Sequence, residues 1–282
     1  KNIINNSKLI SRTEFRQIDS LSDFLADPFF LKEKDTFYIF FENQKVNDNA
    51  EISLLTTTDG VHFDHKGTVL DEDFHLSYPC VFKYKGEFFM LPETKRSNNI
   101  LLYKASNFPY DWSIVDTLVA NVRLKDPMLY LSDSTNLLLA SDDNMQLHLY
   151  ESNSLFSIWK PHSKKIISIG TESRGGGRIF TINDKIMVPL QNSAKGYGYG
   201  VSMYSLNNKQ GRYSLKREIP LIISRVDSIK EFSFGMHHID VQIIDNRIYH
   251  LIDGNETTDE TTTNIYGPIK WNLFDLKNAI IN

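Results

Sequence analysis

The chain has 282 residues, 41% of them hydrophobic and 12% aromatic, and a formal net charge of −4. This size and hydrophobicity allow one domain with a large buried core, whereas the weakly acidic balance offers no basic surface for nucleic acid. No run of 18 apolar residues occurs, so no membrane span is predicted. The single cysteine, Cys80, cannot form a disulfide within the chain, and we expect a buried, inert thiol in a reducing, cytoplasmic location.

The first twenty residues precede the repeated part of the chain and contain one strand-like run, residues 7–17. We expect this run to add an outer strand to the last unit of the repeat described below. The N-terminus has neither an initiator Met nor the apolar core of a signal peptide. We therefore expect residues 1–282 to be a single domain of a longer protein, or a mature form.

From residue 27 onward the same two-strand unit recurs five times. Each copy has two hydrophobic strands joined by a tight turn, with polar residues at both outer ends. The copies cover residues 27–42, 75–93, 126–142, 174–191 and 237–253. Their closing residues are 51, 49, 49 and 62 residues apart, a spacing typical of the blades of a β-propeller.

A third strand-like run follows each copy, at residues 51–56, 100–103, 147–150, 201–204 and 264–266. A weaker fourth run follows several copies, for example at residues 114–119 and 165–169. These patterns predict an all-β, five-bladed β-propeller with four antiparallel strands per blade. The predicted blades start near residues 27, 77, 126, 174 and 237. Trp112, at the end of the second copy, is expected to pack between blades.

The two ends of each unit predict where a functional site would lie. In a propeller blade the first strand leaves one face beside the central channel and the second strand returns to it, so opening and closing residues meet at one mouth. The opening residues are Asp27, Ser77 or Tyr78, Asp126, Arg174, and His237 or His238; the closing residues are Glu42, Glu93, Asp142, Gln191 and Asp253. Each alone could be a strand-end hydrogen-bonding group, but convergent polar groups in a concavity indicate an active site.

Aromatic and glycine residues add to this picture. Tyr78, Tyr197 and Tyr199 would suit stacking on a sugar ring, or would pack within the core. Glycines at 175–177 and 196–200 imply unusual backbone angles or close approach to a ligand. Arg174, Arg178 and the three amides at 175–177 could bind a phosphate, although the P-loop pattern is absent. Alternatively, Arg174 pairs with Asp126 or Asp240 and has only a structural role.

Two resemblances follow from these motifs. Asp27-Pro28 and Asp126-Pro127 resemble the first- and third-blade aspartates of five-bladed propeller glycosidases that act on arabinans, xylans and fructans. The resemblance implies that the first Asp is the base or nucleophile, that the second orients and tunes, and that a later Glu is the acid. This chain has Arg174 at the position of that acid, and Glu172 lies two residues upstream.

A second resemblance covers residues 25 to 255. Its motifs are Ala26-Asp-Pro-Phe, Phe40-Phe-Glu, Phe74-His-Leu-Ser-Tyr-Pro, Met90-Leu-Pro-Glu, Ser173-Arg-Gly-Gly-Gly-Arg-Ile-Phe, Gln191 with Tyr197-Gly, and His237-His-Ile-Asp. They resemble the N-terminal propeller domain of glucosamine inositolphosphorylceramide transferases and their bacterial relatives. That family implies glycosyl transfer onto lipids or surface polysaccharides, often beside a second, fused catalytic domain.

The preferred prediction is a carbohydrate site that transfers a glycosyl group from a phosphate-activated sugar, in glycolipid or surface-polysaccharide synthesis. Asp27 would deprotonate the acceptor hydroxyl, Asp126 and His238 would orient the sugar or the base, Glu93 would bind sugar hydroxyls, and Arg174 with Arg178 would neutralise the leaving phosphate. The further predicted substrate-binding residues are Glu42, His75, Ser77, Tyr78, Gln191, Tyr197, His237, Asp240 and Asp253. The expected ligand is a carbohydrate or sugar nucleotide, with a lipid-linked or polysaccharide acceptor.

Two alternatives remain open at this point. A glycosidase would use Asp27 with Glu93 or Glu172, and needs two carboxyl groups flanking the bond. A non-catalytic glycan-binding module would position substrate for a fused enzyme. No cofactor is predicted. No metal is predicted either, because His75, His237, His238 and Asp240 lack HExxH or CxxC spacing. A nucleophilic Ser77 lacks the GxSxG frame.

Overall fold

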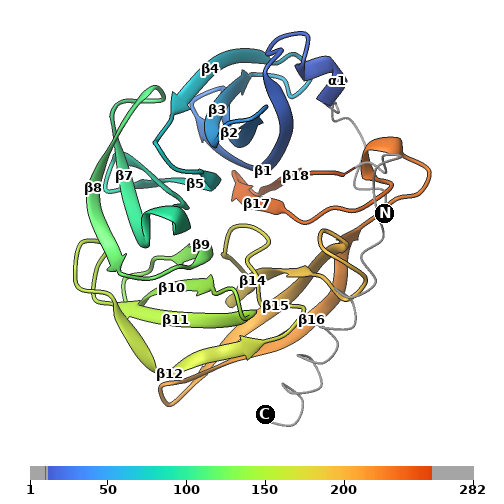
Figure 1. Ribbon diagram of the computed structural model, residues 1–282. Helices are drawn as coiled ribbons and strands as arrows, with labels where there is room; N and C mark the ends of the chain where they lie inside the picture. The colour runs from blue at the N-terminus through green and yellow to red at the C-terminus, as the bar shows by residue number, and fades with distance from the viewer. Residues whose placement is uncertain (1–9, 11, 256–282) are drawn as a thin grey trace.

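A computed structural model describes residue 10 and residues 12–255, which form sheets arranged around a common centre (Figure 1). Four sheets have four antiparallel strands each, paired in chain order. The first blade contains β1 (Ser22–Glu33), β2 (Thr36–Lys45), β3 (Ala50–Thr57) and β4 (Asp64–Leu70); the second, β5 (Ser77–Tyr84), β6 (Glu87–Glu93), β7 (Asn99–Asn107) and β8 (Asp111–Ala120). The third contains β9 (Lys125–Tyr130), β10 (Asn136–Ser141), β11 (Gln146–Ser152) and β12 (Lys160–Ile169); the fourth, β13 (Phe180–Ile182), β14 (Lys185–Asn192), β15 (Gly200–Lys209) and β16 (Arg212–Ser224).

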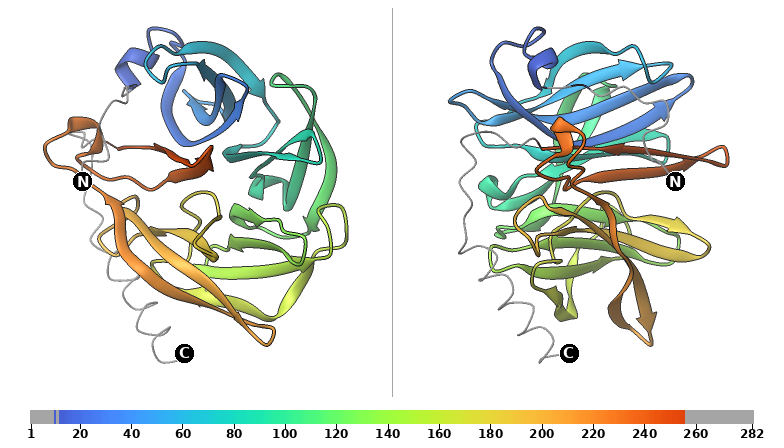
Figure 2. Two further views of the ribbon diagram at one scale, coloured as in Figure 1. Left: turned by 180° about the vertical axis from the view of Figure 1, so that it is seen from behind. Right: turned by 90° about the vertical axis from the view of Figure 1, so that its right-hand side faces the viewer.

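A two-stranded hairpin takes the fifth place in the ring. Its strands are β17 (Ile239–Ile244) and β18 (Arg247–Ile252), and it lies between the first and fourth blades in both face views (Figures 1 and 2). The prediction of an all-β propeller of four-stranded antiparallel blades is confirmed for four blades. The strand expected at residues 264–266 lies outside the described residues, so a five-bladed ring is not confirmed and stays a prediction.

The N-terminal expectation was wrong within the described residues. Instead of a strand, the chain forms a short helix, α1 (Arg12–Phe15). Phe15 is fully buried, and its ring packs edge-on against Phe41 at 5.6 Å and His65 at 4.9 Å between centroids. Burial of this one aromatic side chain on the first blade therefore fixes the segment where the strand was expected. Two further short elements are 3-10 helices, η1 (Lys95–Ser97) and η2 (Lys230–Phe232).

The innermost strands of the first three blades share one bulge. Asp27, Tyr78 and Asp126 each precede a proline and have φ values of 49°, 50° and 47°. The strand register shifts at each of these residues. Proline cannot donate to the ladder, and a left-handed conformation costs a non-glycine residue about 1–2 kcal/mol. Bulges of this kind redirect a side chain and are common beside active sites.

Aromatic packing joins the first two blades. Phe40 lies 5.7 Å from Trp112 and Tyr38 lies 4.9 Å from Phe108, between ring centroids. The prediction that Trp112 packs between blades is confirmed. Cys80 is buried, and burial raises the pKa of its thiol to about 11, so the thiol is unreactive, as expected.

The second blade, the fourth blade and the hairpin contact one another at Gly177. The Tyr78 hydroxyl donates to the Gly177 carbonyl at 2.6 Å and accepts from the Gly177 amide at 2.8 Å. The Ile239 amide donates to the Gly176 carbonyl at 2.8 Å. A Cβ atom on Gly177 would lie 1.8 Å from the Ile239 carbonyl oxygen, so only glycine fits there. In the described part of the chain, no helix is long and apolar enough to cross a membrane.

Gly177→Ala should destabilise the fold far more than Gly60→Ala, as measured by urea unfolding. Both glycines have positive φ (144° and 72°), but an added Cβ on Gly60 meets nothing within 4 Å. The control should therefore lose only the backbone cost of about 1–2 kcal/mol, whereas Gly177→Ala adds a collision with backbone. Equal losses in the two variants would contradict the close contact.

Candidate functional site

The strand register brings the ends of the blades together as a polar ring. Ala26 lies opposite Glu42, Ser77 opposite Glu93, and Lys125 opposite Ser141. In the fourth blade the Gln191 amide donates to the Arg174 carbonyl at 2.8 Å. The closing residue of the third blade is therefore Ser141, not Asp142 as expected.

Asp142 has a different role, in the turn between β10 and β11. Its carboxylate accepts the backbone amides of Asn144 and Gln146 and pairs with His148 Nε2 at 3.0 Å. A constant spacing would have identified Ser141 from sequence. Fifteen residues separate Asp27 from Glu42, Tyr78 from Glu93, Asp126 from Ser141, and His238 from Asp253.

We use "central cluster" for the following interacting residues of the ring: Asp27, Glu42, Glu93, Asp126, Arg174, Gln191, His237, His238 and Asp253. All are buried except Arg174 and His237, which are partly exposed. The cluster gathers all four predicted catalytic residues and five of the predicted substrate-binding residues.

Asp126 and Glu93 form the first half of the cluster. Arg174 donates to both oxygens of Asp126 through Nε and Nη2, Gln191 Nε2 lies 3.3 Å from Asp126 Oδ2, and the Asp126 amide donates to Glu93 Oε2 at 3.2 Å. Burial opposes ionisation of Asp126, but the guanidinium of Arg174 outweighs it and lowers the pKa of that carboxyl. Burial and the charge of Asp126 raise the pKa of Glu93 well above its ordinary value. The pair thus places an ionised carboxylate beside a carboxyl that holds its proton.

Asp27 and two histidines form the second half. Asp27 Oδ1 lies 3.5 Å from His237 Nε2 and 3.5 Å from His238 Nδ1. His238 Nε2 lies 3.1 Å from the Pro28 carbonyl; because a carbonyl only accepts, Nε2 carries the proton and Nδ1 is an acceptor. Asp27 Oδ1 and His238 Nδ1 therefore face each other, and neither has a hydrogen-bond partner in the described part of the chain.

The pKa values of this half follow from burial and charge. Burial lowers the pKa of His238 to about 4, so its ring is neutral. Burial would lower the pKa of His237 too, but Asp253, 2.9 Å from Nδ1, and Asp27 raise it well above its ordinary value. Burial raises the pKa of Asp27 well above the ordinary value; His237 opposes this shift, and the nearby carboxyls of Asp126, Glu42 and Asp253 add to it. Asp27 thus has an unusually high proton affinity and an unoccupied acceptor atom.

Tyr197 covers part of the central cluster from outside. Its ring centroid lies 5.4 Å from that of His237, and the Arg174 guanidinium carbon lies 5.4 Å from the Tyr197 ring. Gly196 and Gly198 flank it with φ values of 119° and 76°. The ring is 46% exposed, so one face remains open to solvent, as a platform for a sugar requires.

Three predicted binding residues lie deeper and have structural contacts, which corrects their assignment. Arg178 pairs with both oxygens of Asp240 and donates to the carbonyls of Val81 and Phe30. The guanidinium therefore ties three blades together and is not free for phosphate. The Tyr78 ring is fully buried, with its hydroxyl held by Gly177.

The glycine run is also occupied. The Gly176 amide donates to the Pro189 carbonyl at 3.0 Å, and the Gly177 amide donates to the Tyr78 hydroxyl. Two of the three amides expected to hold a phosphate are thus used within the protein, which corrects that expectation.

The remaining predicted residues lie at the edge of the central cluster or outside it. His75 Nε2 lies 3.3 Å from Glu42 Oε1 at the edge of the cluster, and Ser77 is buried opposite Glu93. Glu172, the alternative acid, is held by Arg217 and Asn192 at 2.6 Å each, and by the Tyr204 hydroxyl. It is therefore not available as an acid.

One group of described residues has the geometry to hold a metal ion. Ligand atoms of Asp27, His237 and Asp253 lie within 4.8 Å of one another. The pKa of His237 is raised by the same two carboxylates, and a protonated imidazole cannot bind a metal. A metal ion would therefore have to displace that proton in order to bind here. The set that the sequence analysis considered, without predicting a metal, was a different one: His75, His237, His238 and Asp240.

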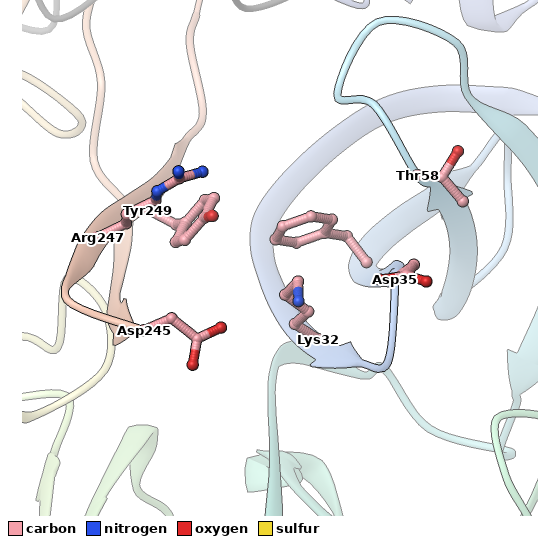
Figure 3. A pocket seen from close by; sticks show the side chains of 7 residues that line it. Lys32, Asp35, Thr58, Asp245, Arg247 and Tyr249 are labelled. Carbon is pink, nitrogen blue, oxygen red and sulfur yellow. The ribbon is translucent and has the colours of Figure 1, made fainter.

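The concavities formed by the described residues include a side pocket and a cleft. A side pocket of about 250 Å³ adjoins the central cluster and is lined by Lys125, Ser141, Asp142, Asp143, Met145, Ser173, Arg174, Ser193 and Tyr197. A cleft of about 570 Å³ separates the first blade from the hairpin, where side chains of the two elements face each other across the gap (Figure 3). The cleft is lined by Lys32, Asp35, Phe37, Thr58, Asp245, Arg247 and Tyr249, none of which belongs to the central cluster.

The side pocket is the concavity with access to the predicted chemistry. The cleft lies at the far turns of β1 and β17, roughly 20 Å along the strand from Asp27 at about 3.3 Å per residue. Among the lining residues of the side pocket, sequence reasoning missed Lys125, Ser141 and Ser193.

Comparison with protein families gives one extended match. A family model described as "Glucosamine inositolphosphorylceramide transferase 1, N-terminal" matches residues 4–255. Proteins named glucosamine inositolphosphorylceramide transferase 1 from Arabidopsis thaliana and Oryza sativa subsp. japonica are 31% identical over 252 residues and 32% identical over 235 residues. The alignments cover 84% and 78% of this chain but 33% and 32% of those proteins, so the chain spans about a third of their length.

Solved structures with a similar fold are propeller glycosidases. An α-L-arabinofuranosidase from Podospora anserina, in complex with cellotriose, has a TM-score of 0.66 at 13% identity, with 90% of each chain covered. A thermostable family-43 glycoside hydrolase has a TM-score of 0.61 at 15% identity, with 83% of this chain and 85% of that chain covered. At these identities the likeness shows the fold alone.

Arg174→Ala should cost about 3–5 kcal/mol of unfolding free energy, because it leaves the carboxylate of Asp126 buried and unpaired. Arg225→Ala is the matched control, since its pair with Asp227 is exposed and should contribute about 0–1 kcal/mol. Urea unfolding measures both. Similar losses in the two variants would mean that Arg174 does not hold a buried charge.

His237 should titrate above pH 6.5 and His238 near pH 4 in an NMR titration of histidine-labelled protein. Asp253→Asn should lower the pKa of His237. Because the His237 pKa is raised and the Asp253 pKa is lowered to about 2, their stabilising contribution is full between about pH 3.8 and 6.5. It is lost as pH rises through the His237 pKa or falls toward 2. A His237 pKa at or below 6.5 would contradict the pairing.

Proposed function

This chain belongs to the family of glucosamine inositolphosphorylceramide transferase 1 N-terminal domains, and we propose that its central cluster transfers a glycosyl group from a phosphate-activated sugar. The reaction would serve glycolipid or surface-polysaccharide synthesis, with a lipid-linked or polysaccharide acceptor in the cytoplasm. The names of the curated relatives support a role in glycosyl transfer, and the fold of the solved neighbours supports a carbohydrate ligand.

One observation carries the proposal: Asp27 Oδ1, buried at the centre of the ring, has raised proton affinity and no donor in the described part of the chain. A general base requires an unoccupied acceptor with a pKa raised toward neutrality. The ion pair with His237 orients the carboxylate, and His238 Nδ1, also unpartnered, is a second acceptor atom beside it.

In the proposed step the acceptor hydroxyl gives its proton to Asp27 Oδ1 and its oxygen attacks the anomeric carbon. The bond from that carbon to the donor phosphate oxygen breaks, and the phosphate leaves with the electron pair. A phosphate leaving group needs no strong acid. Asp126 stays ionised and orients the sugar, and the protonated carboxyl of Glu93 donates to a sugar hydroxyl.

Access to Asp27 requires Tyr197 to move or to act as the stacking surface. Its ring contacts both His237 and Arg174, and the flanking glycines permit backbone rotation. We assign Tyr197 to sugar binding for this reason.

The proposal also covers the domain arrangement and the number of blades. Because the chain spans about a third of its curated relatives, we propose that residues 1–282 are one domain beside a fused catalytic domain. We propose further that the ring has a fifth blade, which begins with the hairpin of β17 and β18.

A glycosidase is the second candidate, and Glu93 is the observation that favours it. A carboxyl that keeps its proton can act as the general acid, with Asp27 as the base. Release of reducing sugar from oligosaccharides, without turnover of sugar nucleotides, would select this reaction. Saturable glycan binding without any turnover would select a binding module.

Asp27→Asn should reduce turnover about 10²- to 10⁴-fold, the usual contribution of a general base, and leave the melting temperature nearly unchanged. Asp227→Asn, at an exposed ion pair, is the control and should keep full activity. The assay follows release of nucleotide from a panel of sugar nucleotides. Full activity in Asp27→Asn would exclude the proposed base.

A further inference from the structure

We infer that the side pocket is a phosphate subsite built from Lys125, Lys95 and Ser141. This inference rests on the proposed function and deepens it, because it locates the phosphate of the ligand on residues that the sequence motifs did not indicate. Arg178 and two of the glycine amides are already used within the protein, so the phosphate requires another place.

Equivalent positions of two neighbouring blades supply cations to this pocket. Lys125 lies opposite the closing residue Ser141 of the third blade, and Arg174 lies opposite the closing residue Gln191 of the fourth. Both line the pocket. Arg174 is largely neutralised by Asp126, so the second available cation is Lys95 of the second blade, which contacts the lining residue Asp143.

Lys95 and Lys125 share a single carboxylate. Their Nζ atoms lie 2.6 Å and 2.7 Å from the same oxygen, Oδ1 of Asp143. At Asp143 two positive charges therefore face one negative charge; the other carboxylate of the lining, Asp142, pairs with His148. Asp143 lies in the turn between β10 and β11 and its side chain is 55% exposed. The side chain can therefore rotate out of the pocket. Its carboxylate occupies the position that an anionic ligand would take.

Ser141 adds an unused donor. It is 1% exposed and lines the pocket, and its Oγ has no hydrogen-bond partner in the described part of the chain. A buried hydroxyl without a partner is costly unless a ligand or water satisfies it. Two ammonium groups and a hydroxyl donor match the charge and the acceptor oxygens of a phosphate ester.

The position of the pocket agrees with the chemistry of the central cluster. Arg174 lines the pocket and also binds Asp126. Only Arg174 would therefore lie between a phosphate in the pocket and the acids that act on its sugar. The phosphate could belong to a nucleoside diphosphate or to a lipid headgroup, which offer the same chemistry to the pocket.

The test measures binding of two probes to the 282-residue chain by calorimetry. One probe is uridine diphosphate; the other is phosphatidylcholine vesicles with and without phosphatidylinositol. Lys125→Gln should weaken binding of the preferred probe about 10- to 100-fold, the scale of a hydrogen bond to a charged group. Asp143→Asn should strengthen it several-fold, because it removes the competing charge. Lys83→Gln and Asp227→Asn, at exposed ion pairs elsewhere, should leave it unchanged.

The gain in Asp143→Asn cannot come from misfolding, so it keeps the test decisive if another variant is unstable. Binding of either probe with these opposite changes supports the subsite and identifies the source of the phosphate. No binding of either probe to the parent protein, or equal affinities in parent, Lys125→Gln and Asp143→Asn, would overturn it. Phosphate binding without sugar-nucleotide turnover would reject the proposed reaction and keep the subsite. Sugar-nucleotide turnover that neither Lys125→Gln nor Asp143→Asn changes would keep the reaction and reject the subsite.

Discussion

The carboxylate of Asp126 is fully buried and stays ionised because the guanidinium of Arg174 contacts it. The negative charge of Asp126 in turn raises the pKa values of the neighbouring acids. Burial alone would protonate Asp126; the bidentate contact with Arg174 keeps it ionised. That fixed negative charge raises the pKa of Glu93 and adds to the shift of Asp27. One ion pair thus separates an ionised carboxylate, Asp126, from a carboxyl that keeps its proton, Glu93, and it raises the proton affinity of Asp27.

The cluster combines strain, burial and unsatisfied atoms at one point of the fold. Asp27 and Asp126 have left-handed backbones before proline, and Asp27, Gln191 and His238 each keep a buried atom without a hydrogen bond in the described part of the chain. A protein core normally satisfies such groups. Their concentration where the blades meet supports the proposal that the ring binds a ligand.

The sequence predicted the repeat and most of the cluster, because hydrophobic periodicity and polar strand ends are local signals. Asp27, Glu93, Asp126 and the His237-His238 pair were placed correctly at one centre. Ser141 was missed by one residue because Asp142 is the charged neighbour; the fifteen-residue spacing of the other units indicates Ser141, and the register confirms it. The burial of Arg178 with Asp240 and the helix at Phe15 depend on contacts between distant segments, which no local pattern contains.

The central claim is that a sugar ligand reaches Asp27 at the centre of the ring. A crystal structure of the 282-residue chain soaked with a sugar nucleotide that it turns over tests this most directly. The account predicts a sugar hydroxyl within hydrogen-bond distance of Asp27 Oδ1 and a displaced Tyr197 ring. A ligand bound instead in the cleft of Lys32 and Tyr249 (Figure 3), with nothing near Asp27, would contradict it.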